Sequence, residues 1–184
     1  MKRLFVAAFF ACFALLANAQ DIPVGIRMEI TEIEQDDNQF SIFTYKDEDG
    51  VYGYYLSLGR EHRLIEVNDG EDGIFNASLS HVDETCVSLG STFEEAMATL
   101  EYLLSLFDKE IGYSTELSGR LSMVEKLGKP TVAKCVVIKR LFGKHLFFLF
   151  DNGRYTADAE LTKGTVKSLI GSMKFERMLR PNKQ

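Results

Sequence analysis

The stretch from Thr131 to Leu161 has the clearest strand pattern of the chain. It opens with a run rich in β-branched residues, continues with LFFLF at 146–150, and then alternates apolar and polar residues with a period of two. Turn signals at 141–144 and 151–153 separate the three runs. The pattern predicts a three-stranded antiparallel meander, with a middle strand that is covered on both faces because it is apolar on both.

The N-terminal part of the chain shows the same alternation, interrupted by short runs of Asp, Asn, Glu and Gly. Such residues are typical of turns, so neighbouring strands should form hairpins. The pattern predicts strands at residues 26–33, 40–45, 51–58 and 82–89, with a weaker and separate one at 63–67.

Helical spacing appears twice, each time after a set of strands. Ser91 and Glu94 match a capping box and precede an apolar stripe of Phe93, Met97, Leu100, Leu104 and Phe107, which predicts a helix that ends near Gly112. A second helix is predicted from Thr162 to Arg180, with an apolar face of Val166, Leu169, Ile170 and Met173. Residues 114–129 fit either a short helix or an edge strand.

These elements predict an α+β fold with an antiparallel β-meander sheet and two main helices packed on one face. We expect a single domain over residues 20–184. Because strands precede a helix twice, residues 20–112 and 113–180 are predicted to be two related halves.

The first 19 residues have the composition of a cleavable signal peptide. Lys2 and Arg3 precede an apolar run at 4–16, and Ala17-Asn18-Ala19 fits a cleavage site after Ala19. The run is shorter than the roughly 20 residues that span a bilayer, although an N-terminal anchor is the alternative. The segment resembles signals of Gram-negative bacteria. We therefore expect an exported protein, periplasmic or secreted, with no transmembrane segment after cleavage.

The chain is acidic, and its charge is unevenly distributed. The net charge is −6, and it becomes −8 when Lys2 and Arg3 leave with the signal peptide. Residues 20–90 carry 16 Asp/Glu and 4 Lys/Arg, a net of −12, whereas residues 91–184 carry a net of +4. Nucleic acid is excluded as a partner, since phosphate binding requires a basic face. The acidic half either neutralises the other half within the fold or attracts a basic partner.

The processed chain keeps two cysteines, Cys86 and Cys135, both in strand-like runs. An oxidising compartment permits a disulfide between them. The alternative is two buried thiols that pack as small apolar side chains.

The sequence contains no recognisable catalytic motif. The three histidines are not spaced as metal ligands, and neither a nucleophile elbow nor a phosphate-binding loop is present. We expect no cofactor. Asp47, Asp49, Asp69 and Asp72 lie in two acidic loops that are weak calcium candidates, but Asp and Gly are also ordinary turn residues.

A group of tyrosines is the strongest candidate for binding: Tyr45, Tyr52, Tyr54 and Tyr55. Tyrosine combines apolar area with a polar tip, which suits interfaces and sugar stacking; alternatively, these side chains border the core. The sequence predicts a small exported non-catalytic protein that binds another protein or an envelope component. The alternatives are a carbohydrate or small-ligand binding protein and a hydrolase with an unidentified carboxylate site.

Overall fold

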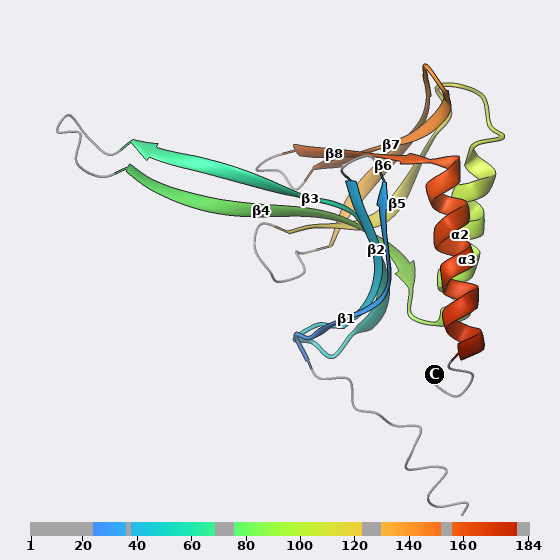
Figure 1. Ribbon diagram of the computed structural model, residues 1–184, viewed down its shortest axis with the longest axis horizontal. Helices are drawn as coiled ribbons and strands as arrows, with labels where there is room; N and C mark the ends of the chain where they lie inside the picture. The colour runs from blue at the N-terminus through green and yellow to red at the C-terminus, as the bar shows by residue number, and fades with distance from the viewer. Residues whose placement is uncertain (1–23, 36–37, 69–75, 123–129, 152–155, 180–184) are drawn as a thin grey trace, which may run out of the picture.

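A computed structural model describes residues 24–35, 38–68, 76–122, 130–151 and 156–179 (Figure 1). Eight strands in these ranges form one sheet in the order β1 to β8, and all neighbours are antiparallel. The α+β class and the antiparallel meander are confirmed. The elements are β1 (Arg27–Gln35), β2 (Asn38–Lys46), β3 (Tyr52–Asn68), β4 (Asn76–Gly90), α2 (Phe93–Leu106), β5 (Ser114–Ser122), β6 (Pro130–Arg140), β7 (Gly143–Asp151), β8 (Thr156–Thr162) and α3 (Lys163–Leu179).

Several boundaries differ from the sequence prediction; α2 ends at Leu106, for example, and not near Gly112. The strand expected at 63–67 is the continuation of β3, and the ambiguous residues after 114 form a strand, β5. The capping box lies one residue later, at Thr92 and Glu95, because the Thr92 side chain accepts a hydrogen bond from the backbone N–H of Glu95. Capping favours any short hydroxyl residue at this point, so the sequence offered both Ser91 and Thr92.

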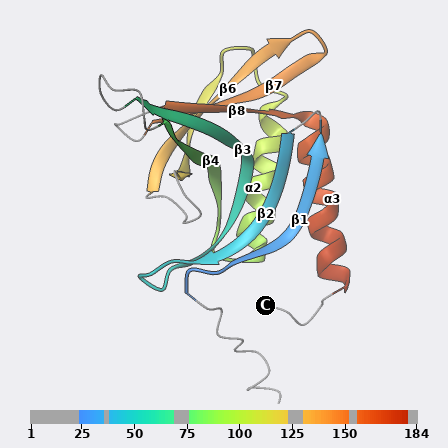
Figure 2. The same cartoon turned by 60° about the vertical axis from the view of Figure 1, so that its left-hand side comes forward.

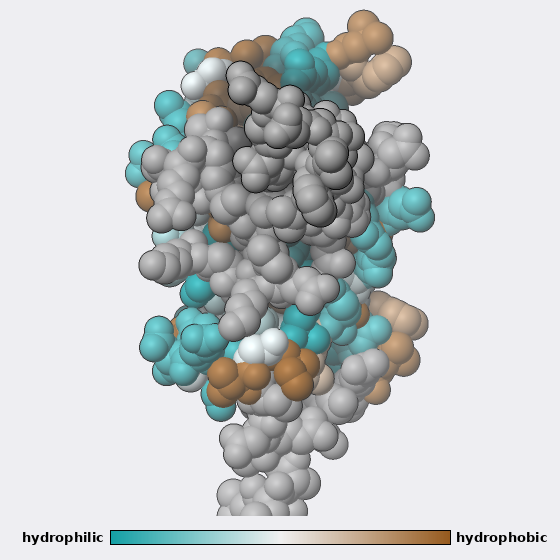
Figure 3. Space-filling model, turned by 90° about the vertical axis from the view of Figure 1, so that its left-hand side faces the viewer, coloured by the Kyte–Doolittle hydropathy of each residue, from teal (hydrophilic) through white to brown (hydrophobic). Residues whose placement is uncertain are grey.

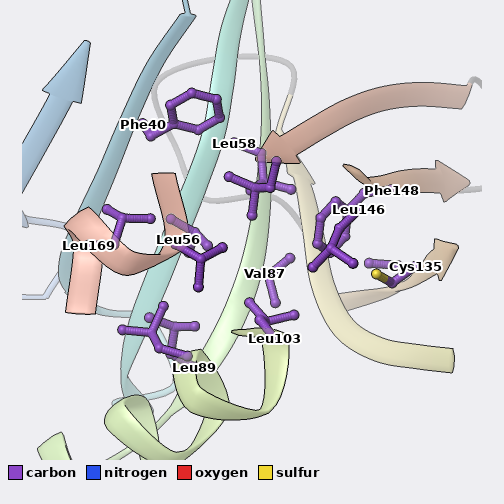
Figure 4. Packing of buried hydrophobic residues seen from close by; sticks show 14 of the residues in the cluster. Phe40, Leu56, Leu58, Val87, Leu89, Leu103, Cys135, Leu146, Phe148 and Leu169 are labelled. Atoms are coloured by element: carbon purple, nitrogen blue, oxygen red, sulfur yellow. The ribbon is translucent and has the colours of Figure 1, made fainter. Parts of the chain in front are cut away.

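The main hydrophobic cluster joins the sheet to both helices, which lie side by side in Figures 1 and 2. Strand side chains such as Leu56 and Val87 meet Leu103 of α2 and Leu169 of α3 (Figure 4). All four side chains are completely buried. Burial on this scale makes the cluster the main source of stability, and we call the sheet face that carries it the inner face.

Strand β7 is fully buried on one face and only partly covered on the other, contrary to the prediction. Leu146, Phe148 and Phe150 are buried in the main cluster, whereas Leu149 is 40% exposed. Successive residues of a strand point to opposite faces, so Leu149 lies on the other side, which we call the outer face. Residues of α2 and α3 belong to the same hydrophobic cluster as these three buried side chains. An apolar run alone therefore does not report how many faces are covered.

The hairpin of β3 and β4 extends well beyond the rest of the sheet (Figures 1 and 2). Strand β2 pairs with β3 only over 52–57, and β5 pairs with β4 only over 84–87. Among the described residues, β3 and β4 beyond these positions pair only with each other, from Glu61 opposite Asp83 to Asn68 opposite Asn76. We call this two-stranded extension, residues 61–68 and 76–83, the ribbon.

Two glycines are expected to respond oppositely to alanine. A methyl group on Gly119 would lie 2.8 Å from Phe150 Cε1 and 3.0 Å from the Cys86 carbonyl oxygen. Gly119→Ala should therefore lower the free energy of unfolding by about 1–3 kcal/mol through overpacking. Gly171 in α3 has no atom within 4 Å of the added position. Gly171→Ala should raise stability by about 0.5–1 kcal/mol. Urea denaturation measures both, and a stabilising Gly119→Ala contradicts the packing around β5.

Candidate functional site

A second, smaller hydrophobic cluster lies on the outer face of the sheet. It consists of Phe43, Tyr45, Tyr55 and Cys86, and all four are buried. Strand alternation explains the division, because Ile42, Leu56 and Val87 are their immediate neighbours and belong to the main cluster. No described helix covers this group, so other side chains must shield it. We call it, together with Arg27 and Arg120, the arginine–aromatic cluster.

Arg27 covers the Phe43 end of the cluster. Its guanidinium carbon lies 3.7 Å from the centroid of the Phe43 ring. It donates hydrogen bonds to Glu84 Oε1 at 2.5 Å, to Ser41 Oγ at 2.7 Å, and to Glu29. Burial lowers the pKa of Arg27, but the hydrogen bonds and charges of Glu84 and then Glu29 outweigh it, so the pKa is raised. Arg27 is thus a permanent cation held between an aromatic ring and carboxylates.

Arg120 performs the same role at the Tyr55 end. Its guanidinium lies 5.5 Å from the Tyr55 ring centroid, and its Nη2 lies 3.5 Å from Asp47 Oδ2. Burial raises the pKa of the Tyr55 hydroxyl, although Arg120 acts in the opposite direction. The charges in this region are therefore paired across strands instead of being presented to a ligand.

A polar pocket of about 30 Å³ opens beside Arg27. Glutamate, glutamine and serine side chains make up the rest of its wall: Glu29, Glu32, Gln39, Ser41 and Ser57. Pockets that bury small organic ligands are usually larger, at about 300–1,000 Å³, and mostly apolar. This pocket accordingly has room for about one water molecule and not for a cofactor.

The four tyrosines named from the sequence are divided between the two faces. Tyr45 and Tyr55 belong to the outer cluster, with exposed fractions of 6% and 3%. Tyr52 and Tyr54 lie elsewhere, with ring centroids 5.7 Å apart in an edge-to-face arrangement, and Tyr54 packs against the main cluster. Burial, followed by the hydrogen bond with Tyr52, raises the pKa of Tyr54. The fold therefore does not bring the four rings to one surface.

The weak calcium candidates serve as turn residues where the structure describes them. Asp47 Oδ1 accepts a hydrogen bond from the backbone N–H of Val51 at 2.8 Å, and its other oxygen faces Arg120. Asp49 is exposed in the same turn, and Asp69 and Asp72 lie outside the described residues. Among the residues described, no group of three or more His, Cys, Asp or Glu could hold a metal ion.

No disulfide joins Cys86 and Cys135. Cys86 belongs to the outer cluster and Cys135 to the main cluster, so the sheet separates them. Burial raises the pKa of the Cys135 thiol to about 12. The structure therefore agrees with the alternative prediction, in which both cysteines are buried thiols that pack as small apolar side chains.

We expect Cys135 to resist thiol reagents in the native state, because a thiol with so high a pKa forms almost no thiolate. Titration with Ellman's reagent at mildly alkaline pH should find Cys135 unmodified before, and modified after, addition of guanidinium. Rapid native modification of Cys135, or a disulfide recovered by mass spectrometry, contradicts this placement. A Cys135→Ser variant assigns the signal to the correct cysteine.

The residues that organise this region, Arg27, Glu84 and Arg120, were not identified from the sequence. In an alternating strand, charged residues between apolar ones indicate a solvent-exposed face. This pattern would therefore predict that all three side chains are exposed to water. Their role depends on cross-strand register, which places Cys86 opposite both Ser57 and Arg120. The sequence contained only a weak indication of this contact. Arg27 lies at the start of the first predicted strand, 16 residues before the aromatic residue Phe43.

Comparison with known proteins adds no relationship. No protein-family model matches this chain, and no curated protein or solved structure matches it significantly. Among the described helices, none combines the length and the apolar composition required to cross a bilayer.

Proposed function

We propose that this chain is an exported, non-catalytic binding protein that docks to a protein partner through the ribbon of β3 and β4. The observation that supports this most directly is the length over which the two strands, among the described residues, pair only with each other, from Glu61 opposite Asp83 to Asn68 opposite Asn76. An isolated two-stranded hairpin is only marginally stable in water. Its two outer edges also carry unpaired backbone donors and acceptors, which another chain can use.

The composition of the hairpin indicates the chemistry of the partner. Residues 60–83 contain six Asp/Glu and two Lys/Arg, a net charge of −4. Among them are Leu64, Ile65, Val67 and Leu79, with Ile65 opposite Leu79 in the register. An acidic strand pair with aliphatic positions fits a basic partner that adds a strand to one edge. Opposite charge would speed the encounter, and backbone hydrogen bonds would hold the complex.

The arginine–aromatic cluster supports the base of the ribbon. Glu84 lies opposite Arg60, where the ribbon leaves the sheet, and it accepts hydrogen bonds from Arg27 and from Ser57 Oγ at 2.7 Å. These bonds tie β4 to β1 and β3 at the junction. On this proposal the buried charges set the direction in which the ribbon projects.

Site-specific photo-crosslinking in cells that express the full chain tests this function. A photoreactive residue at position 65 in the ribbon is expected to yield an adduct of discrete mass. The matched control is position 167, where Lys167 is exposed on α3. Adducts from both positions, or from neither, contradict docking through the ribbon. An adduct of twice the chain mass indicates contact between copies and contradicts a separate partner.

The proposal also includes the export and the architecture that the sequence predicts. We infer that residues 1–19 are removed, that both helices cover one face, and that two halves of four strands and a helix are related. The element order supports the last point, because β1–β4 precede α2 and β5–β8 precede α3. N-terminal sequencing of the exported chain tests cleavage after Ala19. Superposition of the two halves tests the repeat, and helices on opposite faces would contradict it.

Carbohydrate binding is the second candidate, and the half-buried pair Tyr52 and Tyr54 is the feature that favours it. A Tyr52→Ala/Tyr54→Ala variant that retains binding on a glycan array eliminates this site. A hydrolase remains a third proposal with no assigned carboxylates.

A further inference from the structure

The turn between β6 and β7 ends in two large apolar side chains that are almost fully exposed. Leu141 is 87% exposed and Phe142 is 94% exposed. The next residue, Gly143, has a φ of 135°, which a side chain would disfavour, so the turn geometry is built for glycine. Figure 3 shows hydrophobic atoms projecting at the upper end of the molecule, where Figure 1 places this turn. Single exposed leucines are common, but an adjacent pair at a hairpin tip is not.

A second loop lies against this turn and enlarges the apolar end. Lys144 Nζ donates a hydrogen bond to the Phe107 carbonyl oxygen at 3.1 Å and another to that of Lys109 at 2.5 Å. The Gly112 backbone N–H donates to the Val137 carbonyl at 2.8 Å. These bonds hold the loop after α2 beside β6, and this loop exposes Ile111 and Tyr113. The end of the molecule thus presents four apolar or aromatic side chains on two connected loops.

Basic residues outnumber acidic ones in and beside these two loops. The five cations are Lys109, Lys139, Arg140, Lys144 and Lys163, and the three anions are Asp108, Glu110 and Glu160, so the local net charge is +2. The whole chain has a net charge of −6. Arg140 pairs with Glu160, and Lys163 Nζ lies 3.0 Å from Asp108 Oδ1, so the anions are held beside the cations. This end is therefore positive on an acidic molecule.

We propose that this end of the molecule docks on the surface of a bilayer that contains anionic phospholipid. Leu141 and Phe142 enter the interface between headgroups and acyl chains, Tyr113 lies at headgroup level, and Lys109 and Lys139 face the phosphates. Aliphatic and aromatic side chains ringed by Lys and Arg are the combination that interfacial membrane binding uses. A protein partner would instead need a pocket for both side chains. This proposal is independent of the ribbon and of its partner.

The chain contains no tryptophan, which permits a direct optical test. Phe142→Trp introduces a single reporter at the tip, and Val51→Trp introduces one in the β2–β3 turn, at the other end of the molecule in Figure 1. Residues 20–184, which include every described element, are mixed with vesicles of phosphatidylcholine alone or with added phosphatidylglycerol. The fluorescence emission of the Phe142→Trp variant should shift to shorter wavelength when phosphatidylglycerol is present, and the emission of the Val51→Trp variant should not. Equal shifts, or none at the tip, overturn the proposal.

Vesicle co-sedimentation of the tryptophan-free chain supplies the second measurement. Leu141→Ser/Phe142→Ser should weaken partitioning by roughly tenfold per residue, since each loses apolar burial in the interface. Met178→Ser/Leu179→Ser is the matched control, because both residues are exposed at the end of α3, and it should bind as the parent chain does. Lys109→Gln/Lys139→Gln should lose about fivefold per charge on anionic vesicles only.

Three outcomes overturn the proposal. One is a parent chain that does not sediment with anionic vesicles, and another is a Leu141→Ser/Phe142→Ser variant that binds as well as its parent. The third combines a parent chain that is dimeric and does not bind vesicles with a Leu141→Ser/Phe142→Ser variant that is monomeric. This result would mean that the tip forms a contact between two copies of the chain. An unchanged urea midpoint shows that the tip variants remain folded.

Discussion

Replacing Phe148 with alanine is expected to lower the free energy of unfolding by about 3–5 kcal/mol. The ring is completely buried in β7, where it stacks on Phe150 with centroids 6.5 Å apart. Its removal takes a large apolar surface out of the main cluster and leaves a cavity that neighbouring strands cannot fill. Because the free energy of unfolding of a domain is commonly about 5–15 kcal/mol, a loss of this size could remove most of the stability of the protein. Urea denaturation monitored by circular dichroism measures it.

The adjacent residue provides the matched control. Leu149 lies on the same strand, on the outer face, and is 40% exposed. Leu149→Ala should therefore cost only about 1 kcal/mol or less, since much of its surface remains in water in the folded state. Similar losses for the two variants would mean that β7 is covered on both faces, as its sequence alone suggested, and would contradict the observed division.

Replacing Arg27 with methionine is expected to lower the free energy of unfolding by about 2–3 kcal/mol, which is less than for a fully buried ion pair. The side chains of Arg27 and Glu84 retain 20% and 14% of their exposure. Methionine keeps the apolar stem over Phe43 but removes the donors to Glu84, Glu29 and Ser41. Glu84 then loses a charged partner in a poorly solvated site. Urea denaturation at neutral pH measures the loss.

A second arginine in the chain tests whether burial causes this effect. Arg177 also lies over an aromatic ring, 4.5 Å from the Phe93 centroid, and it pairs with Glu94 at 2.6 Å. The side chains of this pair are 49% and 64% exposed. Arg177→Met should cost only about 0–1 kcal/mol, the usual value of a solvated pair. Equal losses for the two arginines would contradict the burial argument.

The Arg27 result also bears on the proposed function. Glu84 lies where the ribbon leaves the sheet, so loss of its partner should loosen the junction. Hydrogen exchange of backbone amides around 57–60 and 84–86 should accelerate in Arg27→Met more than in Arg177→Met. If the exchange rates of these amides are unchanged, the arginine–aromatic cluster stabilises the fold but does not control the ribbon.

Local periodicity carried most of the fold prediction. The alternation between residues 26 and 58, and the β-branched, apolar and alternating runs between 131 and 161, identified six strands. The apolar stripes of α2 and α3 were equally clear, since helical spacing produces burial on one side. The prediction failed where periodicity is weak or ambiguous. The run at 63–67 continues β3, and its pairing with β4 depends on residues 10 to 18 positions away, from Val67 opposite Ala77 to Arg63 opposite His81.

The sequence by itself determined the α+β class, the meander and the residues that fill the main core, because these follow from alternation along short stretches of chain. Only the tertiary structure decided which face each strand covers, where β3 leaves the sheet, and why Cys86 and Cys135 stay apart. It also placed Arg27 over Phe43 and beside Glu84, 57 positions along the chain. Those features depend on register between strands, and register arises from contacts between distant residues that no local pattern records.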